Sequence, residues 1–522
     1  MRKFNKQVHT TAMEEKNKLV KDDLFELIQS LTKSEKRYFK IYASRHIIGE
    51  EKKSILLFDY LDKQVTYNHQ KTIDYCKSFI KMKQFSISKN RLYTFILSAL
   101  DLYYATATIE AQIYKLLHAF EILFRKSLYT QCAKTIQKAE KLAEKHGLIQ
   151  LFPEIQKQQK RLFETKNHTV LSLKMIDAIQ AKDAEIAHEN NLYTQLWTLK
   201  SKLFYQIATK GNARTTDEIA SYHAFLQQLP ALSEIKGSEN TYLFHHIKSA
   251  CAFALSDFLA SFSHVKILIE LLEAPIKLDE KNTNRYIALL SNAIHLAEKL
   301  GEHNLASNYL QRLNNLRNND SVLHAEDLQL KLVATTISIK LNLYIQRGEI
   351  DRAERMITSI KEELERFKDK MALPKKAYIL FKIAVIHLVK GNYSLALKEI
   401  NTLLSLPGIE HVETLFSHAQ LLAILVHLEL KHNDLLAYSL KNTQRYLKTR
   451  QRLFAFETVF LKNITSILKA PNSIDAEERW DQLFQDLSKI EYTSDELELF
   501  DFLKWAEAKK GNLTAISVFQ TN

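Results

Sequence analysis

One local pattern recurs in the second half of this chain and restricts its fold: a break that ends an apolar helical run, followed five residues later by Ala. It occurs four times, the last time with His in place of Gly, at Gly301–Ala306, Gly348–Ala353, Gly391–Ala396 and His432–Ala437. The successive intervals are 47, 43 and 41 residues. Gly permits the tight reversal between antiparallel helices, and a small side chain on the second helix lets the first approach closely. Because each pair leaves an apolar face uncovered, the pattern predicts a stack of helix pairs.

The scarcity of Gly and Pro favours the same fold class. The 522 residues include only 9 Gly and 6 Pro, several times fewer than average usage would give. β-Hairpins and Gly-rich loops need many residues with positive or preset φ, whereas long helices with short connections need few. Apolar residues recur at helical spacing, and Thr32–Glu35 and Thr215–Glu218 fit capping boxes. The sequence therefore predicts an all-α protein.

The unit at 378–410, YILFKIAVIHLVKGNYSLALKEINTLLSLPGIE, resembles a tetratricopeptide repeat. In this resemblance Gly391 lies in the turn, Ala396 packs in the second helix, and Leu380 replaces the usual large aromatic residue. The intervals of 41–47 residues also exceed the 34 of the family. The resemblance is clear over about 280–440, weak over 441–522, and only a helical rhythm over 100–280. HEAT-like or irregular hairpins remain open for the N-terminal half.

The resemblance implies a right-handed superhelical α-solenoid with a groove lined by the first helices of successive pairs. In the best-matching unit the implied groove residues are Phe381, Val385, Leu388 and Val389, with Tyr378 at the rim. Such grooves receive a protein or peptide partner. The function predicted for the chain is therefore that of a non-enzymatic helical-repeat scaffold.

Charge divides the chain into unequal parts. The net charge is +13, and residues 1–150 alone hold 27 Lys+Arg against 16 Asp+Glu. We predict four parts: a tail at 1–20 that is disordered or contains an alternative start, a basic helical region at 21–110, degenerate helical hairpins at 111–280, and tetratricopeptide-like repeats at 281–522. Such an asymmetry concerns partners rather than fold.

The basic region supports an alternative function, in which it binds nucleic acid and the repeats sense a partner. Its cations alternate with aromatic residues in two short helical segments, as in a helix-turn-helix reader. The candidate phosphate contacts are Lys36, Arg37, Lys40, Arg45, Lys81, Lys83, Lys89 and Arg91. In the competing interpretation, the aromatic residues belong to a core and the lysines only solvate the outer face.

Catalytic and metal-binding signatures are absent from the sequence. It has no Gly-x-Gly, P-loop, Gly-x-Ser-x-Gly or His-Glu-x-x-His motif, and Cys76, Cys132 and Cys251 are too far apart for a zinc ribbon. We expect no enzyme activity, no cofactor and no metal, although a dispersed catalytic site is invisible in sequence. The N-terminus lacks a secretory signal, and no apolar stretch reaches 18 residues, which favours a cytoplasmic protein without a membrane span. The sequence does not predict an oligomeric state.

Overall fold

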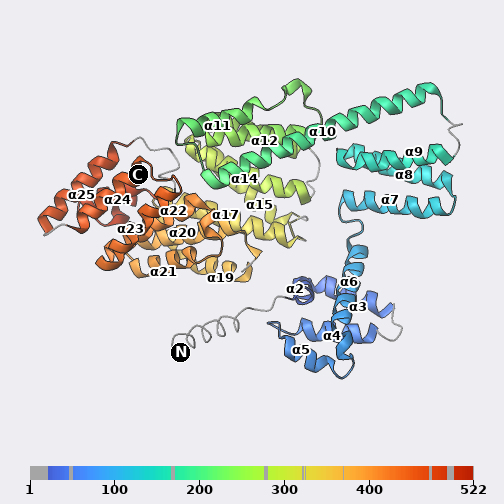
Figure 1. Ribbon diagram of the computed structural model, residues 1–522, viewed down its shortest axis with the longest axis horizontal. Helices are drawn as coiled ribbons and strands as arrows, with labels where there is room; N and C mark the ends of the chain where they lie inside the picture. The colour runs from blue at the N-terminus through green and yellow to red at the C-terminus, as the bar shows by residue number, and fades with distance from the viewer. Residues whose placement is uncertain are drawn as a thin grey trace, which may run out of the picture. The chain divides into compact units, whose positions relative to one another are not determined.

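The computed structural model describes residues 22–45, 51–165, 171–274, 280–319, 322–323, 325–367, 370–469, 473–490 and 499–520. Throughout these ranges the chain is all-α, without a β-strand (Figure 1). The tail predicted at 1–20 lies outside them. The chain separates into two compact units, 1–183 and 184–522. The division falls inside the segment 111–280 that the sequence groups together.

The first unit contains two groups of helices. One group consists of α2 (Asp23–Ser30), α3 (Lys33–Arg45), α4 (Glu51–Asp62), α5 (His69–Cys76), η2 (Met82–Gln84) and α6 (Phe85–Tyr104). Its core includes Phe39, whose ring lies 4.7 Å from that of Phe58. The other group consists of α7 (Ile109–Arg125), α8 (Tyr129–Lys145), η3 (Ile149–Leu151) and α9 (Phe152–Thr165). The long helix α10 (Leu173–Lys210) contains the boundary between the units.

The second unit is an α-solenoid of consecutive helix pairs (Figure 1). After α11 (Thr216–Gln227) and η4 (Leu232–Glu234), the first helices of the pairs are α12 (Ser238–Ala254), α14 (Glu280–Lys299), α17 (Glu326–Gln346), α20 (Leu373–Val389), α22 (Glu413–Glu429) and α24 (Ala455–Leu468). The second helices are α13 (Phe258–Glu273), α15 (His303–Asn315), α18 (Ile350–Arg355) continued by α19 (Ile357–Phe367), α21 (Tyr393–Leu404), α23 (Asn433–Thr449) and α25 (Ser473–Ser488). Short turns of η5 (Leu316–Asn318) and η7 (Ile409–His411) follow α15 and α21. The right-handed sense of the superhelix stays a prediction.

The first helices pack against one another as well as against their partners. Helix α14 contacts α17, α17 contacts α20, and α20 contacts α22. Every residue from Ile379 to Val389 in α20 is buried. A helix that is apolar all round must be covered on several sides, and here the neighbouring pairs supply that cover.

The turns between paired helices share one hydrogen-bonded geometry. At Gly391 φ is +76°, and the N–H of Asn392 donates to the carbonyl of His387 at 2.8 Å. This is the Schellman arrangement, which satisfies carbonyls left over at a helix end. The same bond closes the turns at Ser256 and Lys431, residues with positive φ that are not glycine. The series of helix pairs thus includes turns that contain no glycine, which the sequence pattern does not mark.

The residue five positions after each left-handed residue is buried where the helices meet. Ala306, Ala353 and Ala396 occupy this position after the three glycines, and each is at most 1% exposed. After Ser256 the same position holds the buried Ser261. In the fourth turn the structure corrects the predicted register by one residue. The left-handed residue is Lys431 rather than His432, so the buried position belongs to Leu436, and Ala437 is exposed.

The C-terminal segment, residues 499–520, returns to the middle of the array. It contains α27 (Phe502–Lys510) and α28 (Ala515–Gln520), and α28 contacts α20. Lys382 of α20, which is 1% exposed, donates from Nζ to the carbonyl of Leu499 at 3.2 Å. Trp505 donates from its indole N–H to Glu429 of α22 at 3.2 Å. The buried aromatic residues of this segment, Phe500, Phe502, Trp505 and Phe519, belong to the same core cluster as α20 and α22.

A second long-range contact, which we call the clasp, joins the α10–α11 turn to the start of α24. Arg214 makes a bidentate ion pair with Glu457, with nitrogen–oxygen distances of 2.9 and 3.1 Å, and its guanidinium carbon lies 3.8 Å from the centre of the Phe454 ring. The side chains of Arg214 and Glu457 are 11% and 3% exposed. The clasp therefore links residues 243 positions apart within the second unit.

Among the described residues, no helix alone has the length and hydropathy that a membrane span requires. Within the described ranges, one pair of helices, Met82–Tyr104 and Ile109–Arg125, has that length and hydropathy when the two are taken together, but they are bent by 104°.

Candidate functional site

The groove residues implied by the repeat resemblance lie in the core. Phe381, Val385, Leu388 and Val389 are at most 2% exposed. They share a cluster with the aromatic side chains of the C-terminal segment, which returns to this face of the array. Since a buried side chain cannot contact a partner, these four residues do not form an open groove. Tyr378, predicted at the rim, is half-buried and lines a cavity.

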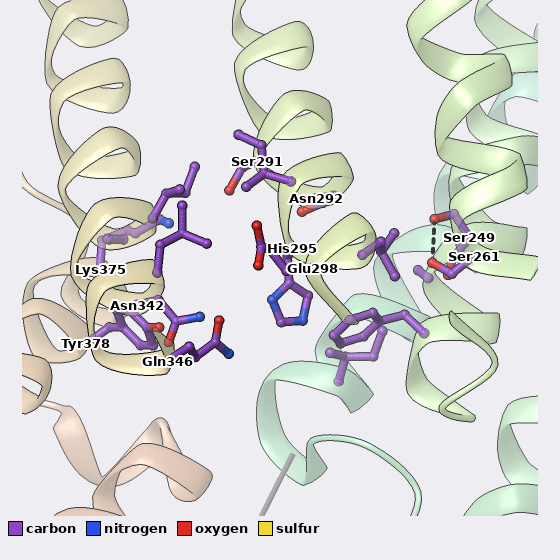
Figure 2. A pocket seen from close by; sticks show the side chains of 18 of the residues that line it. Ser249, Ser261, Ser291, Asn292, His295, Glu298, Asn342, Gln346, Lys375 and Tyr378 are labelled. Carbon is purple, nitrogen blue, oxygen red and sulfur yellow. Dashed lines mark hydrogen bonds between the residues drawn. The ribbon is translucent and has the colours of Figure 1, made fainter. Parts of the chain in front are cut away.

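That cavity has a volume of about 340 Å³ and lies among the first helices of earlier pairs. Its walls come from α10, α12, α14, α17 and α20, with Ser261 added by α13. Figure 2 shows the polar side chains of α14 facing those of α17 and α20 across the open space. First helices thus supply most of this lining, and of the five predicted groove residues Tyr378 alone belongs to it.

One wall of the cavity is apolar and contains fixed polar groups. Phe204, Ile207 and Phe253 supply aromatic and aliphatic surface. Nearby, Ser261 donates to the carbonyl of Ser249 at 3.0 Å, and the two hydroxyls are 3.2 Å apart (Figure 2). These serines hold α13 against α12. Such a mixture of apolar wall and a few oriented polar groups is typical of ligand sites.

Two charged residues line the cavity, and their situations differ. The carboxylate of Glu298 is paired with residues that do not line the cavity: its oxygens accept from Arg347 at 2.8 Å and from His303 at 2.9 Å. Lys375 forms no ion pair within the described residues. Burial and, secondarily, the nearby charge of Lys331 lower the pKa of Lys375. The cavity therefore presents one cation without a counter-ion from the described part of the chain.

Oδ1 of Asn342 and Nδ1 of His246 are buried at the cavity and lack a hydrogen-bond partner among the described residues. Asn342 is 8% exposed. Burial, with the charges of Lys200 and Arg285, lowers the pKa of His246 to about 3, so its ring is neutral near pH 7. An unpaired buried acceptor is costly, and a ligand that donates a hydrogen bond to it relieves that cost.

The cations proposed for nucleic-acid contact are partly engaged with carboxylates. Lys36 pairs with Asp62 at 2.6 Å, Lys40 with Asp59 at 2.7 Å, and Lys89 with Asp22. Arg37, Arg45, Lys81, Lys83 and Arg91 are not in the core. The aromatic residue Phe39, which lies between Lys36 and Lys40 in the sequence, is in the core. These pairings favour the competing interpretation, in which the aromatic residues pack inside and the lysines face outward.

The three cysteines and the acidic residues do not assemble a reactive or metal-binding cluster in the described part of the chain. Cys76, Cys132 and Cys251 are buried and unpaired with one another. Burial raises the pKa of Cys76 to about 11 and that of Cys251 to about 12. Over the described ranges, no three His, Cys, Asp or Glu side chains are placed to hold a metal ion. The arrangement at the cavity is suited to hydrogen bonding and apolar contact.

Sequence reasoning missed the residues that define the cavity, above all Asn342, His246 and Lys375. A signal exists: the polar residues Ser338, Asn342 and Gln346 recur at every fourth position, which places them on one face of a helix. The interpretation instead followed the unit that best fits the repeat pattern, and that unit lies farther along the array.

Comparisons with known proteins identify no family for the chain. No protein-family model matches the sequence, and no curated protein matches it significantly. Among solved structures, the chain is similar to the crystal structure of the tetratricopeptide-repeat domain of P58(IPK). The two are 13% identical, with a TM-score of 0.19, and the match covers 77% of this chain and 99% of the other. The solenoid architecture follows from the helix contacts of the chain itself.

Proposed function

We propose that this chain is a helical-repeat scaffold, without catalysis of its own, that binds a segment of a protein or peptide partner in the cavity between α12, α14, α17 and α20. The observation that carries the proposal is the unpaired, buried Oδ1 of Asn342 in the wall of a cavity of about 340 Å³. Peptide main chains supply N–H donors at regular intervals, and apolar side chains suit the wall formed by Phe204 and Phe253.

Binding of nucleic acid by the basic region is the less favoured alternative. Of the eight candidate cations, Lys36, Lys40 and Lys89 already form ion pairs with aspartates. Neutralising phosphates requires cations that are available to release counter-ions, and engaged lysines contribute less.

Replacing Asn342 by Leu tests the proposal, because binding and stability are expected to change in opposite directions. Leu has nearly the same shape and removes the unpaired acceptor, so the free energy of unfolding should rise by about 1 kcal/mol. Peptides selected from a random display library on the full chain should bind the variant about tenfold more weakly. Urea denaturation and fluorescence anisotropy measure the two quantities.

Asn463→Leu provides the matched control. Asn463 is 7% exposed, but its amide donates to the carbonyl of Val459 at 3.0 Å and to Asp486 at 3.2 Å. This substitution should lower stability and leave peptide binding unchanged. A library that yields no ligand sensitive to Asn342→Leu would show that the cavity does not bind peptides.

A further inference from the structure

Three cations occupy equivalent positions in successive first helices. Arg285 in α14 lies 16 residues before Gly301, Lys331 in α17 lies 17 before Gly348, and Lys375 in α20 lies 16 before Gly391. Because each glycine ends its first helix at the same kind of turn, these positions correspond to within one residue along the array. We call Arg285, Lys331 and Lys375 the cation row.

The members of the cation row lie close enough to affect the pKa of a neighbouring lysine or to contact the next helix. The charge of Lys331 contributes to lowering the pKa of Lys375. Lys331 donates from Nζ to the carbonyl of Asn284, the residue next to Arg285, at 2.7 Å. The charge of Arg285 in turn contributes to lowering the pKa of Lys200 on α10. All four side chains are half-buried, so each remains within reach of a partner.

The carboxylates near the row do not balance it. Glu239 of α12 accepts a bidentate pair from Arg285, at 2.9 and 2.8 Å, and also pairs with Lys281 at 3.0 Å. Asp327, one turn before Lys331 on α17, acts on Lys331 only through its charge. Glu298 is engaged by Arg347 and His303. Within the described residues neither Lys200 nor Lys375 forms an ion pair, which leaves an excess of positive charge beside the cavity.

The helix spacing fixes the separation between successive cations. Helices α14, α17 and α20 pack directly on their neighbours, and packed helix axes lie about 8–10 Å apart. A polyproline II chain advances about 3.1 Å per residue and makes one turn in three residues, so roughly three residues pass from one first helix to the next. Carboxylates at every third residue of such a chain lie on one side of it and would therefore match the row.

We propose that the segment bound at the cavity is an acidic segment in the polyproline II conformation, and that its Asp or Glu side chains, three residues apart, pair with Lys331 and Lys375 and, at the third position, add to the pair that Arg285 makes with Glu239. The proposal rests on the proposed function and adds to it the chemistry and spacing of the partner. Aligned carboxylates would supply the negative charge that the row lacks, and pairing in a partly buried setting is stronger than at an open surface.

Three blocked nine-residue peptides, measured by fluorescence anisotropy on the full chain at low and moderate salt, test the spacing. The first has Asp at positions 1, 4 and 7, the second has the same composition with Asp at positions 1, 2 and 3, and the third has Asn at positions 1, 4 and 7. Acetyl and amide ends remove terminal charges. The first should bind about tenfold tighter than the other two, and its advantage should shrink as salt rises. Equal affinities for the three peptides would overturn the proposal.

The double substitution Lys331→Gln with Lys375→Gln tests the residues. It should abolish the preference for the spaced peptide, whereas Lys398→Gln with Lys441→Gln, which removes the same charge from α21 and α23, away from the row, should preserve it. Thermal denaturation checks that both variants fold. If library peptides that depend on Asn342 bind the Lys331/Lys375 variant as tightly as the native chain, the acidic partner is excluded while the cavity remains a peptide site.

Discussion

Truncating Arg214 to Ala is expected to lower the free energy of unfolding of the second unit by about 3–5 kcal/mol. The reason is the burial of its partner: Glu457 is 3% exposed and would keep a charge without the bidentate pair. Removing one member of a buried ion pair costs much more than the net contribution of the pair, because the remaining charge stays desolvated. Loss of the contact between the guanidinium and the Phe454 ring adds to the effect.

Urea denaturation of the full chain measures this loss, and a double-mutant cycle with Glu457→Gln isolates the coupling. The double variant should lose clearly less stability than the sum of the single losses. Lys510→Ala is the control, because its pair with Asp481 has a similar nitrogen–oxygen distance, 2.8 Å, but consists of a single contact between side chains that are both 42% exposed. That variant should change stability by less than about 1 kcal/mol. Strictly additive losses at Arg214 and Glu457 would contradict the clasp.

Gly348→Ala is expected to destabilise the protein by about 3 kcal/mol or more. A Cβ atom at this position would lie 2.7 Å from the carbonyl oxygen of Phe519 and 2.8 Å from Cα of Gln520. Those atoms are backbone and cannot rotate away, so α28 must leave its site against the array. Displacing it exposes the ring of Phe519, now 4% exposed, and the loss of one buried aromatic residue is alone of this size.

Gly391→Ala separates that effect from backbone strain. Gly391 has a φ of +76° against +69° at Gly348, but no atom lies within 4 Å of the position a Cβ would take. It should therefore cost only the strain of a left-handed Ala, about 1 kcal/mol. Equal losses for the two variants, measured by denaturation, would mean that α28 does not pack on Gly348.

The repeated turn was readable in sequence only where glycine marks it. Gly301, Gly348 and Gly391 stand out, but Ser256 and Lys431 adopt the same left-handed conformation with ordinary side chains. The surrounding helices impose that conformation at a small cost, and a sequence pattern cannot record it. This explains the one-residue error that placed the fourth packing position at Ala437 instead of Leu436.

The position of the candidate site could not be predicted from local sequence patterns, because it depends on contacts between segments that are distant in the sequence. Phe381 and Val385 are apolar residues of the kind that line a groove, but the C-terminal segment contributes its aromatic residues to the core in which they lie. The hydrogen bond from Lys382 to Leu499 spans 117 residues. Periodicity predicts which face of a helix is apolar, and it does not predict which distant segment covers that face.

These same long-range contacts change how the second unit should unfold. In an open solenoid each repeat contacts only its neighbours, so the end repeats can melt while the middle stays folded. Here the bond from Lys382 to Leu499 ties the middle of the array to its end, and the clasp from Arg214 to Glu457 ties its beginning to a late pair. The array from α11 to α28 should therefore lose its structure in one cooperative transition, with hydrogen exchange at its outer pairs slowed nearly as much as at its centre.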